Sequence, residues 1–243
     1  LDTPGHVDFS AEAERTLQVL DCAILVISGT DGVQAHPRPL WRLLERYHVP
    51  TFLFVNKVDL AGADRSAVLA GLKQRLGSGC VDFSGERDES FREEAAVCDE
   101  SVLERYLETG VLTDGDLRRM VGKRKLFPCW FGSALKLEGV EEFLSGLDRY
   151  LPVPDYPQEF AARVFKVTRD DQGSRLTWMK ITGGSLKAKT PLSGGEGEDR
   201  WEEKADQLRL YSGAKFQPAE QAEAGMFYAV LFFCLCQCYL LLP

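Results

Sequence analysis

The 243-residue sequence predicts an α/β domain built on a parallel sheet with flanking helices, followed by a small all-β barrel domain. Short apolar runs alternate with helical patterns in the first part of the chain, and glycine-punctuated strand patterns follow a proline-rich spacer. The composition, 44% hydrophobic and 27% charged, is that of a globular protein. The net charge of −8 argues against a protein that binds nucleic acid through its whole surface, although a local basic patch remains compatible with it.

The parallel sheet is predicted from three apolar runs, which are Cys22–Ser28, Thr51–Val55 and Leu126–Phe131. None of them alternates strictly between apolar and polar residues, and strands that are covered on both faces read in this way. Apolar residues at helical spacing precede the first two runs (Phe9, Ala13, Leu17 and Leu20; then Leu40, Leu43, Leu44 and Tyr47). This alternation predicts strand–helix–strand units with right-handed crossovers.

The segment between the second and third apolar runs is longer and more polar. We expect helices at Ser66–Leu76 and Ser101–Leu107, and a loop or an inserted excursion at Gly77–Glu89. The basic run at residues 123–125 is expected on a solvated face, with contact to RNA as the alternative.

A proline-rich spacer separates the two predicted domains. A helix at Gly139–Leu151 closes the first domain, which we place at residues 1–152, and Pro152, Pro154 and Pro157 then form a stiff linker. The second domain is placed at residues 158–230, with short strands expected at Ala161–Thr168, Arg175–Ile181 and Ala222–Val230.

The last part of the chain, residues 231–243, is an atypical tail rich in leucine and cysteine. We expect a sequence artefact such as a frameshift there, and a metal site at the alternating Cys234, Cys236 and Cys238 is the alternative. The seven cysteines of the chain are odd in number and scattered, which predicts reduced thiols in a cytoplasm.

The chain opens on a motif that suits a metal–phosphate site, Asp2-Thr3-Pro4-Gly5-His6. A carboxylate at the end of a strand can face the shell of a Mg²⁺ ion, and a glycine lets a main-chain N–H approach a phosphate without a Cβ in the way. The alternative is a plain strand-to-helix turn, because Asp, Pro and Gly are common turn residues.

A second motif, Asn56-Lys57-Val58-Asp59, directly follows the second apolar run. Ligands bind at the carboxyl ends of strands in open α/β sheets, and a carboxylate there can accept two N–H groups from a guanine edge. Adenine lacks that donor pair, so it would leave the carboxylate unpaired. Asn56 can brace the loop and contact the base, and the Lys57 stem can cover the face of the base. The alternative is an ordinary polar loop.

A third motif, Gly132-Ser133-Ala134-Leu135, follows the third apolar run. Small residues at this point let a main-chain N–H reach a base oxygen. Taken alone this signal is weak, but the three motifs occur in one order, and each one follows or flanks a predicted strand.

DTPGH, NKVD and GSAL, in that order, resemble the third, fourth and fifth motifs of the translational GTPases. The run from residue 1 to residue 59 resembles elongation factor G and the tetracycline-resistance ribosomal protection proteins. The short segment between NKVD and GSAL is closer to the ribosomal protection proteins. The resemblance implies a P-loop GTPase-type sheet followed by a translation-factor-type β-barrel domain.

The resemblance also implies roles for the motif residues. His6 would orient the attacking water as the catalytic residue, Asp2 would hold Mg²⁺ through water, and the Gly5 main chain would bind the γ-phosphate. The expected GTP-binding residues are Asp2, Thr3, Pro4, Gly5, His6, Asn56, Lys57, Val58, Asp59, Ser133, Ala134 and Leu135. GTP or GDP and Mg²⁺ are the expected ligands.

The sequence departs from the family pattern because it contains no G-x-x-x-x-G-K-[ST] loop and no first switch. We therefore expect an N-terminally truncated fragment of a cytoplasmic, monomeric GTPase that hydrolyses GTP on the ribosome, in contact with rRNA and ribosomal proteins and not with a membrane. A ribosomal protection protein that confers tetracycline resistance is the first expectation. The alternatives are an elongation factor G-type translocase and a guanine-nucleotide-binding remnant without hydrolysis.

Overall fold

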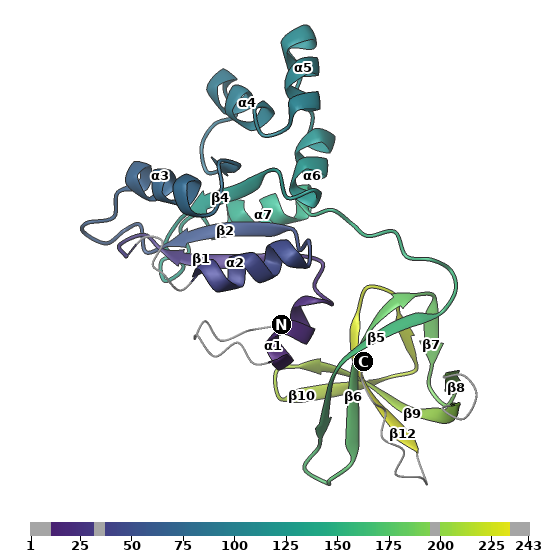
Figure 1. Cartoon of the computed structure of the whole chain (residues 1–243). Coiled ribbons are helices and arrows are strands. Elements are labelled where there is room, and N and C mark those ends of the chain that lie inside the picture. Colours follow the sequence, from purple (N-terminus) through teal and green to yellow (C-terminus); the bar gives the residue numbers. More distant parts are fainter. Residues whose placement is uncertain (1–10, 32–36, 195–199, 234–243) are drawn as a thin grey trace. The chain divides into compact units, whose positions relative to one another are not determined.

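The computed structural model describes residues 11–31, 37–194 and 200–233, and the chain divides into two compact units (Figure 1). Within the described residues, unit 1 comprises residues 20–153 and unit 2 comprises residues 11–19 together with the chain from residue 154 onwards. In the described part of the chain, no helix combines the length and the apolar composition that crossing a membrane requires.

Unit 1 is built on a four-stranded sheet in the order β1-β2-β4-β3, and all three strand pairs are parallel. Its strands are β1 (Ala23–Ser28), β2 (Thr51–Asn56), β3 (Cys80–Asp82) and β4 (Phe127–Phe131). Three of them were predicted, but the expectation of a loop throughout Gly77–Glu89 is wrong at β3. Three residues are too few to show a period, and only pairing with β4 identifies them as a strand.

Six helices of unit 1 accompany this sheet among the described residues, namely α2 (Pro37–Arg46), α3 (Arg65–Arg75), α4 (Glu89–Ala96), α5 (Glu100–Thr109), α6 (Asp114–Gly122) and α7 (Val140–Tyr150). Side-chain caps fix where four of them begin. Asp64, Asp88, Asp99 and Thr113 each accept a main-chain N–H from the first turn of the helix that follows. A cap of this kind satisfies one of the N–H groups that have no partner within the helix.

The continuous apolar character of the strands is explained by two cores, one on each face of the sheet. In β2, Phe52 and Phe54 pack with residues of α4, α5, α6 and α7. The intervening Leu53 and Val55 pack with residues of α2 and α3. Figure 1 shows α2 and α7 on opposite sides of the sheet. The predicted parallel sheet with flanking helices is confirmed, and both of its faces are covered as the sequence pattern indicated.

Unit 2 contains α1 (Ala11–Leu17) and antiparallel strands. A six-stranded sheet has the path β10-β9-β12-β6-β5 with β8 paired to β9, and β7 pairs with β11 in a second sheet. The strands are β5 (Ala161–Arg169), β6 (Arg175–Gly183), β7 (Ser185–Lys187), β8 (Pro191–Gly194), β9 (Trp201–Ser212), β10 (Lys215–Ala219), β11 (Gln221–Glu223) and β12 (Phe227–Phe233). The predicted all-β region is confirmed, and its strand pairs are antiparallel.

The two sheets of unit 2 share one core, to which Leu186 of β7 and Ala222 of β11 contribute together with residues of β6, β9 and β12. The single strand expected at Ala222–Val230 is wrong, because a turn divides it into β11 and β12. Gly225 lies in that turn with a φ of 88°, in the left-handed region that glycine adopts without strain. The terminal cysteines 234, 236 and 238 lie outside the described residues, and the four described cysteines are free thiols (Cys22, Cys80, Cys98 and Cys129).

Candidate functional site

Two loops meet at the carboxyl edge of the parallel sheet. One follows β2 and the other follows β4, and these neighbouring strands are in parallel register, with Val55 opposite Phe131. The Val58 N–H donates to the Gly132 carbonyl (3.2 Å), and the Gly132 N–H donates to the Val55 carbonyl (2.9 Å). The structure therefore brings together the NKVD and GSAL motifs, which lie more than seventy residues apart in the sequence.

Asn56, the last residue of β2, ties the two loops together through its side chain. Its Oδ1 accepts the main-chain N–H of Lys57 (2.8 Å) and that of Ala134 (2.9 Å). Its own carbonyl accepts the N–H of Gly29 at the end of β1 (2.7 Å). Asn56 thus holds the loops through two side-chain hydrogen bonds and one main-chain hydrogen bond, and the Ala134 N–H is one of the donors. Its contact with a base stays a prediction.

The loop after β4 is a tight turn that depends on two glycines. Ser133 and Glu138 exchange two main-chain hydrogen bonds, each 3.0 Å long. A Cβ on Gly132 would lie 2.2 Å from the Glu138 carbonyl oxygen, and one on Gly139 would lie 2.7 Å from the Phe131 carbonyl oxygen. Gly139 also has a φ of 73°. A side chain at either position would displace the backbone that presents Ser133 and Ala134.

Asp59 is the carboxylate of the NKVD motif at this edge. The residue as a whole is exposed, but its side chain is only 14% exposed, and its Oδ2 lies 3.0 Å from the Lys136 Nζ. The hydrogen bond from Lys136 and a second one from the Ser133 hydroxyl lower the pKa of Asp59, against the opposing effect of burial. The carboxylate is therefore ionised at neutral pH and can only accept hydrogen bonds.

Each of the two motifs also contains a long residue that is exposed, which is Lys57 in NKVD and Leu135 in GSAL. Lys57 has a φ of 65°, which is uncommon for a residue other than glycine, and its side chain is exposed. Leu135 is 94% exposed. Exposed apolar stems at a binding edge can cover the face of a planar ligand. Val58, by contrast, packs against the core beneath the sheet, so its contribution is to anchor the loop.

These residues fit a planar ligand that presents two adjacent N–H donors, as guanine does with its N1–H and exocyclic amine. The Asp59 carboxylate offers two oxygens, each with more than one acceptor position, so positions remain for a ligand beside its hydrogen bonds from Lys136 and Ser133. Sequence reasoning missed two members of the site, Gly29 and Lys136. The signal for Lys136 was its position directly after GSAL, where a cation can reach the acid of NKVD.

A separate cavity of about 450 Å³ lies between the segment after β1 and helix α3, lined by Gly29, Thr30, Asp31, Gly62, Asp64, Ala67, Val68, Gly71, Gln74 and Arg75. None of the NKVD or GSAL residues lines it. We therefore place the candidate site at the open edge formed by the two loops.

The opening motif, with Asp2, Thr3, Pro4, Gly5 and His6, lies outside the described residues, so the phosphate and Mg²⁺ roles expected there stay predictions. Among the residues that the structure does describe, no group of three or more His, Cys, Asp or Glu side chains is arranged to hold a metal ion.

Comparison with known proteins identifies the family of this chain. A profile of the elongation factor Tu GTP binding domain matches residues 1–153, which is more than half of the chain. The chain belongs to this family. The resemblance carried by DTPGH, NKVD and GSAL is thus confirmed at the family level, and the match includes all three motifs.

Two further relatives extend beyond this GTP-binding domain. Elongation factor G of Ureaplasma urealyticum serovar 10 (strain ATCC 33699 / Western) is 30% identical over 254 aligned residues, which cover 76% of this chain and 37% of that protein. A crystal structure of a protein from Thermus thermophilus has a TM-score of 0.78 at 25% sequence identity, and the match covers 97% of this chain and 42% of that one. The chain spans less than half the length of each.

Proposed function

We propose that this protein binds guanine nucleotides at the edge formed by Asn56–Asp59 and Ser133–Leu135, with Asp59 as the residue that reads the base. The observation that supports this most is the Asp59 carboxylate itself. It is largely shielded by its own surroundings, it is kept ionised by Lys136 and Ser133, and it lies at the ends of adjacent parallel strands. In the proposed complex it accepts the N1–H and the exocyclic amine of guanine.

The remaining residues have distinct parts in the proposal. The Lys57 stem and Leu135 cover the two faces of the base, while Asn56 keeps the loops in register through the hydrogen bonds described above. Asp2 would hold Mg²⁺ through water and the Gly5 main chain would contact the γ-phosphate, and Thr3 and Pro4 belong to the same motif. A bound Mg²⁺ would neutralise charge that develops on the phosphate oxygens.

We further propose that the protein that contains this chain hydrolyses GTP when it is docked on the ribosome, with His6 orienting the attacking water. The family match and the similarity to an elongation factor G support a translational GTPase. We expect it to act as a monomer in the cytoplasm, with rRNA and ribosomal proteins as partners.

For the role on the ribosome, we weigh ribosomal protection against translocation. The short segment between NKVD and GSAL favours a ribosomal protection protein, whereas the curated relative is an elongation factor G and supports a translocase. Release of tetracycline from loaded 70S ribosomes, measured with GTP present, tests the first role. Translocation of a peptidyl-tRNA analogue on the same ribosomes tests the second.

The proposed recognition of guanine by Asp59 is tested by comparing the binding of GDP, ADP and xanthosine diphosphate by calorimetry. Asp59→Asn replaces one carboxylate oxygen with a donor, so GDP binding should weaken by roughly 100-fold or more and xanthosine diphosphate should become the preferred ligand. Asp148→Asn is the matched control, because Asp148 is an exposed carboxylate on α7 in the same unit. Unchanged base preference in Asp59→Asn would remove Asp59 from the role of base reader.

The hydrolytic role is tested separately with His6→Ala. We expect this variant to bind GTP nearly as the wild type does and to lose about 100-fold or more of its ribosome-stimulated turnover, because it lacks the group that orients water. Equal turnover in both proteins would exclude His6 from the mechanism. Binding without any turnover in the wild type would support the alternative of a nucleotide-binding remnant.

A further inference from the structure

One cation at the proposed base site belongs to neither of the motifs that predicted the site. Lys136 follows Leu135 in the loop after β4, and its main-chain N–H donates to the Ser133 carbonyl (3.1 Å). Its Nζ lies 3.0 Å from Asp59 Oδ2 across the junction of the two loops. The Lys136 side chain is 53% exposed whereas that of Asp59 is 14% exposed, so an exposed ammonium group is paired with a largely shielded carboxylate.

The geometry points to Lys136 as a positioning residue that fixes the Asp59 carboxylate and thereby sets how strongly the site prefers guanine. This inference rests on the proposed function. It adds a specificity-determining residue to that site and assigns Lys136 no direct contact with the base.

Lys136 and Ser133 together fix the orientation of the Asp59 carboxylate. A carboxylate can rotate about its terminal bond, and that torsion is broad in unconstrained side chains. Lys136 holds Oδ2, and the Ser133 hydroxyl supplies a second hydrogen bond to the same carboxylate. Held from these two positions, the carboxylate has its remaining acceptor sites in a fixed plane. A ligand with two parallel N–H donors gains binding affinity from a carboxylate held in one plane, whereas a ligand with one donor gains less affinity.

Lys136 also affects the charge of Asp59. Two side chains affect the ionisation of Asp59. Lys136 acts as a charged hydrogen-bond donor and Ser133 as a neutral one. Glu138 lies beyond Lys136 and acts on the lysine. The pKa of Asp59 is lowered and that of Lys136 is raised by their mutual hydrogen bond, so both stay charged through the neutral range. Removing the ammonium group should let the pKa of Asp59 rise.

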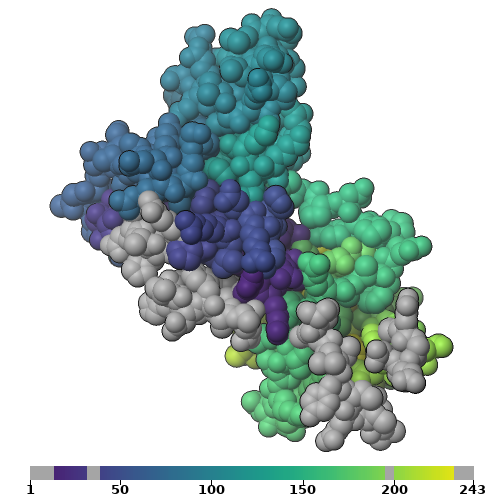
Figure 2. Space-filling view, in the orientation of Figure 1, coloured from purple at the N-terminus to yellow at the C-terminus, as the bar shows by residue number. Residues whose placement is uncertain are grey.

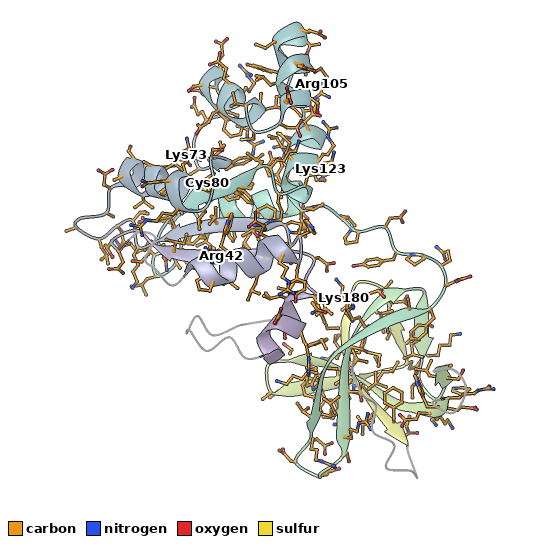
Figure 3. The ribbon with its side chains drawn as sticks, viewed as in Figure 1. Arg42, Lys73, Cys80, Arg105, Lys123 and Lys180 are labelled. Carbon is orange, nitrogen blue, oxygen red and sulfur yellow. The ribbon has the colours of Figure 1, made fainter. Side chains whose placement is uncertain are left out.

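The variants are Lys136→Met, which keeps an unbranched side chain but removes the charge, and Lys136→Arg, which keeps the charge. Lys123→Met is the matched control, because Lys123 is an exposed lysine of the same unit that immediately follows α6 (Figure 3). The probes are GDP, inosine diphosphate and ADP, with affinities measured by calorimetry from pH 4 to pH 8. Hypoxanthine lacks the exocyclic amine, so the ratio of GDP affinity to inosine diphosphate affinity reports the two-point contact.

For Lys136→Met we expect that ratio to fall by about two- to fivefold, which is the range that an exposed ion pair contributes. Because GDP binding needs the ionised carboxylate, it is lost as the pH falls through the pKa of Asp59. That loss should begin at a higher pH in Lys136→Met. Lys136→Arg should restore both the ratio and the pH profile, and Lys123→Met should match the wild type in both.

The outcomes separate this inference from the function on which it rests. A wild type that shows no preference for GDP over ADP would overturn the proposed function. A wild type that prefers GDP, combined with a Lys136→Met variant of unchanged ratio and unchanged pH profile, would overturn the role of Lys136 alone.

A measurement without nucleotide gives a further check. The ¹³Cγ shift of Asp59, titrated by NMR in the wild type and in Lys136→Met, reports the ionisation of the carboxylate directly. We expect the carboxylate of the variant to take up its proton at a higher pH. Identical titration curves would show that Lys136 does not control Asp59, whatever the two proteins bind.

Discussion

The helical segment from α4 to α6 and the loop edge after β2 and β4 use carboxylates in opposite ways. Figure 2 shows the side chains of α4 and α5 as one continuous surface at an end of unit 1, and Arg105 on α5 is labelled in Figure 3. On α6, the Asp116 side chain is 4% exposed and contacts both Arg105 and Arg119. At the loop edge, Asp59 has one exposed ammonium partner and one hydroxyl partner.

The difference lies in how many acceptor positions are already filled. Asp116 accepts the N–H and the hydroxyl of Thr113 in a capping box, in addition to its two arginines. Asp99 likewise caps α5, accepts the Ser101 hydroxyl and pairs with Lys125. A carboxylate satisfied in this way by its own fold stabilises structure. One that is held in place with acceptor positions remaining, at the end of a parallel strand, is suited to a ligand.

The largest effect on stability is expected for Asp116→Ala. The change removes the capping box of α6 and leaves two arginines without their carboxylate, so the free energy of unfolding should fall by about 2–3 kcal/mol. Urea unfolding followed by circular dichroism measures it, and Glu108→Ala on the exposed side of α5 is the control that should change little. A loss no greater than that of the control would mean that Asp116 is not a structural carboxylate.

A smaller loss is expected for Asp99→Ala. This change removes the cap of α5, where the Val102 N–H donates to Asp99 Oδ1 at 3.2 Å, and it frees Lys125. Because Lys125 is already about half exposed, most of the cost is that of the cap, about 1–2 kcal/mol. The same urea series measures it. If Asp99→Ala cost more than Asp116→Ala, the ranking by number of satisfied acceptor positions would be wrong.

Acid should weaken the same segment, because protonation removes the charge that Asp116 shares with its two arginines. Burial raises the pKa of Asp116, but the hydrogen bonds from Thr113 and Arg105 outweigh it and lower that pKa from 3.8 to about 2. A lowered pKa contributes stability that is full above pH 4 and is lost as the pH falls towards 2. Unfolding midpoints between pH 6 and pH 2 should therefore fall mainly below pH 4, and the Asp116→Ala variant should show a shallower decline.

The smallest effect on stability is expected for Asp59→Asn, which is the change with the largest expected effect on nucleotide binding. Asp59→Asn should shift Tm by less than about 2 °C, because Asp59 caps no helix and its cationic partner is exposed. Differential scanning calorimetry without nucleotide measures this shift. A fall in Tm similar to that of Asp116→Ala would place Asp59 among the structural carboxylates and erase the contrast between the two regions.

The basic run at residues 123–125 shows what local pattern reading misses. It was expected on a solvated face, but only its outer members are exposed. Arg124 is partly buried, donates to the Val49 carbonyl and to Thr51 Oγ1, and lies over the rings of Trp41 and Phe127. Those four partners come from three other segments of the chain. A sequence window around Arg124 contains none of them except Phe127.

The sequence by itself determined the parallel sheet, the β region that follows it, and the two motifs at the ends of neighbouring strands. Apolar runs, glycine turns and strand-end polar residues are local features, so their spacing is sufficient to predict them. The tertiary structure alone decided the strand at Cys80–Asp82, the hydrogen bonds of Asn56 to both loops, and the ion pair of Asp59 with Lys136. Each of these depends on segments that become neighbours only when the sheet pairs, and no local period records such a contact.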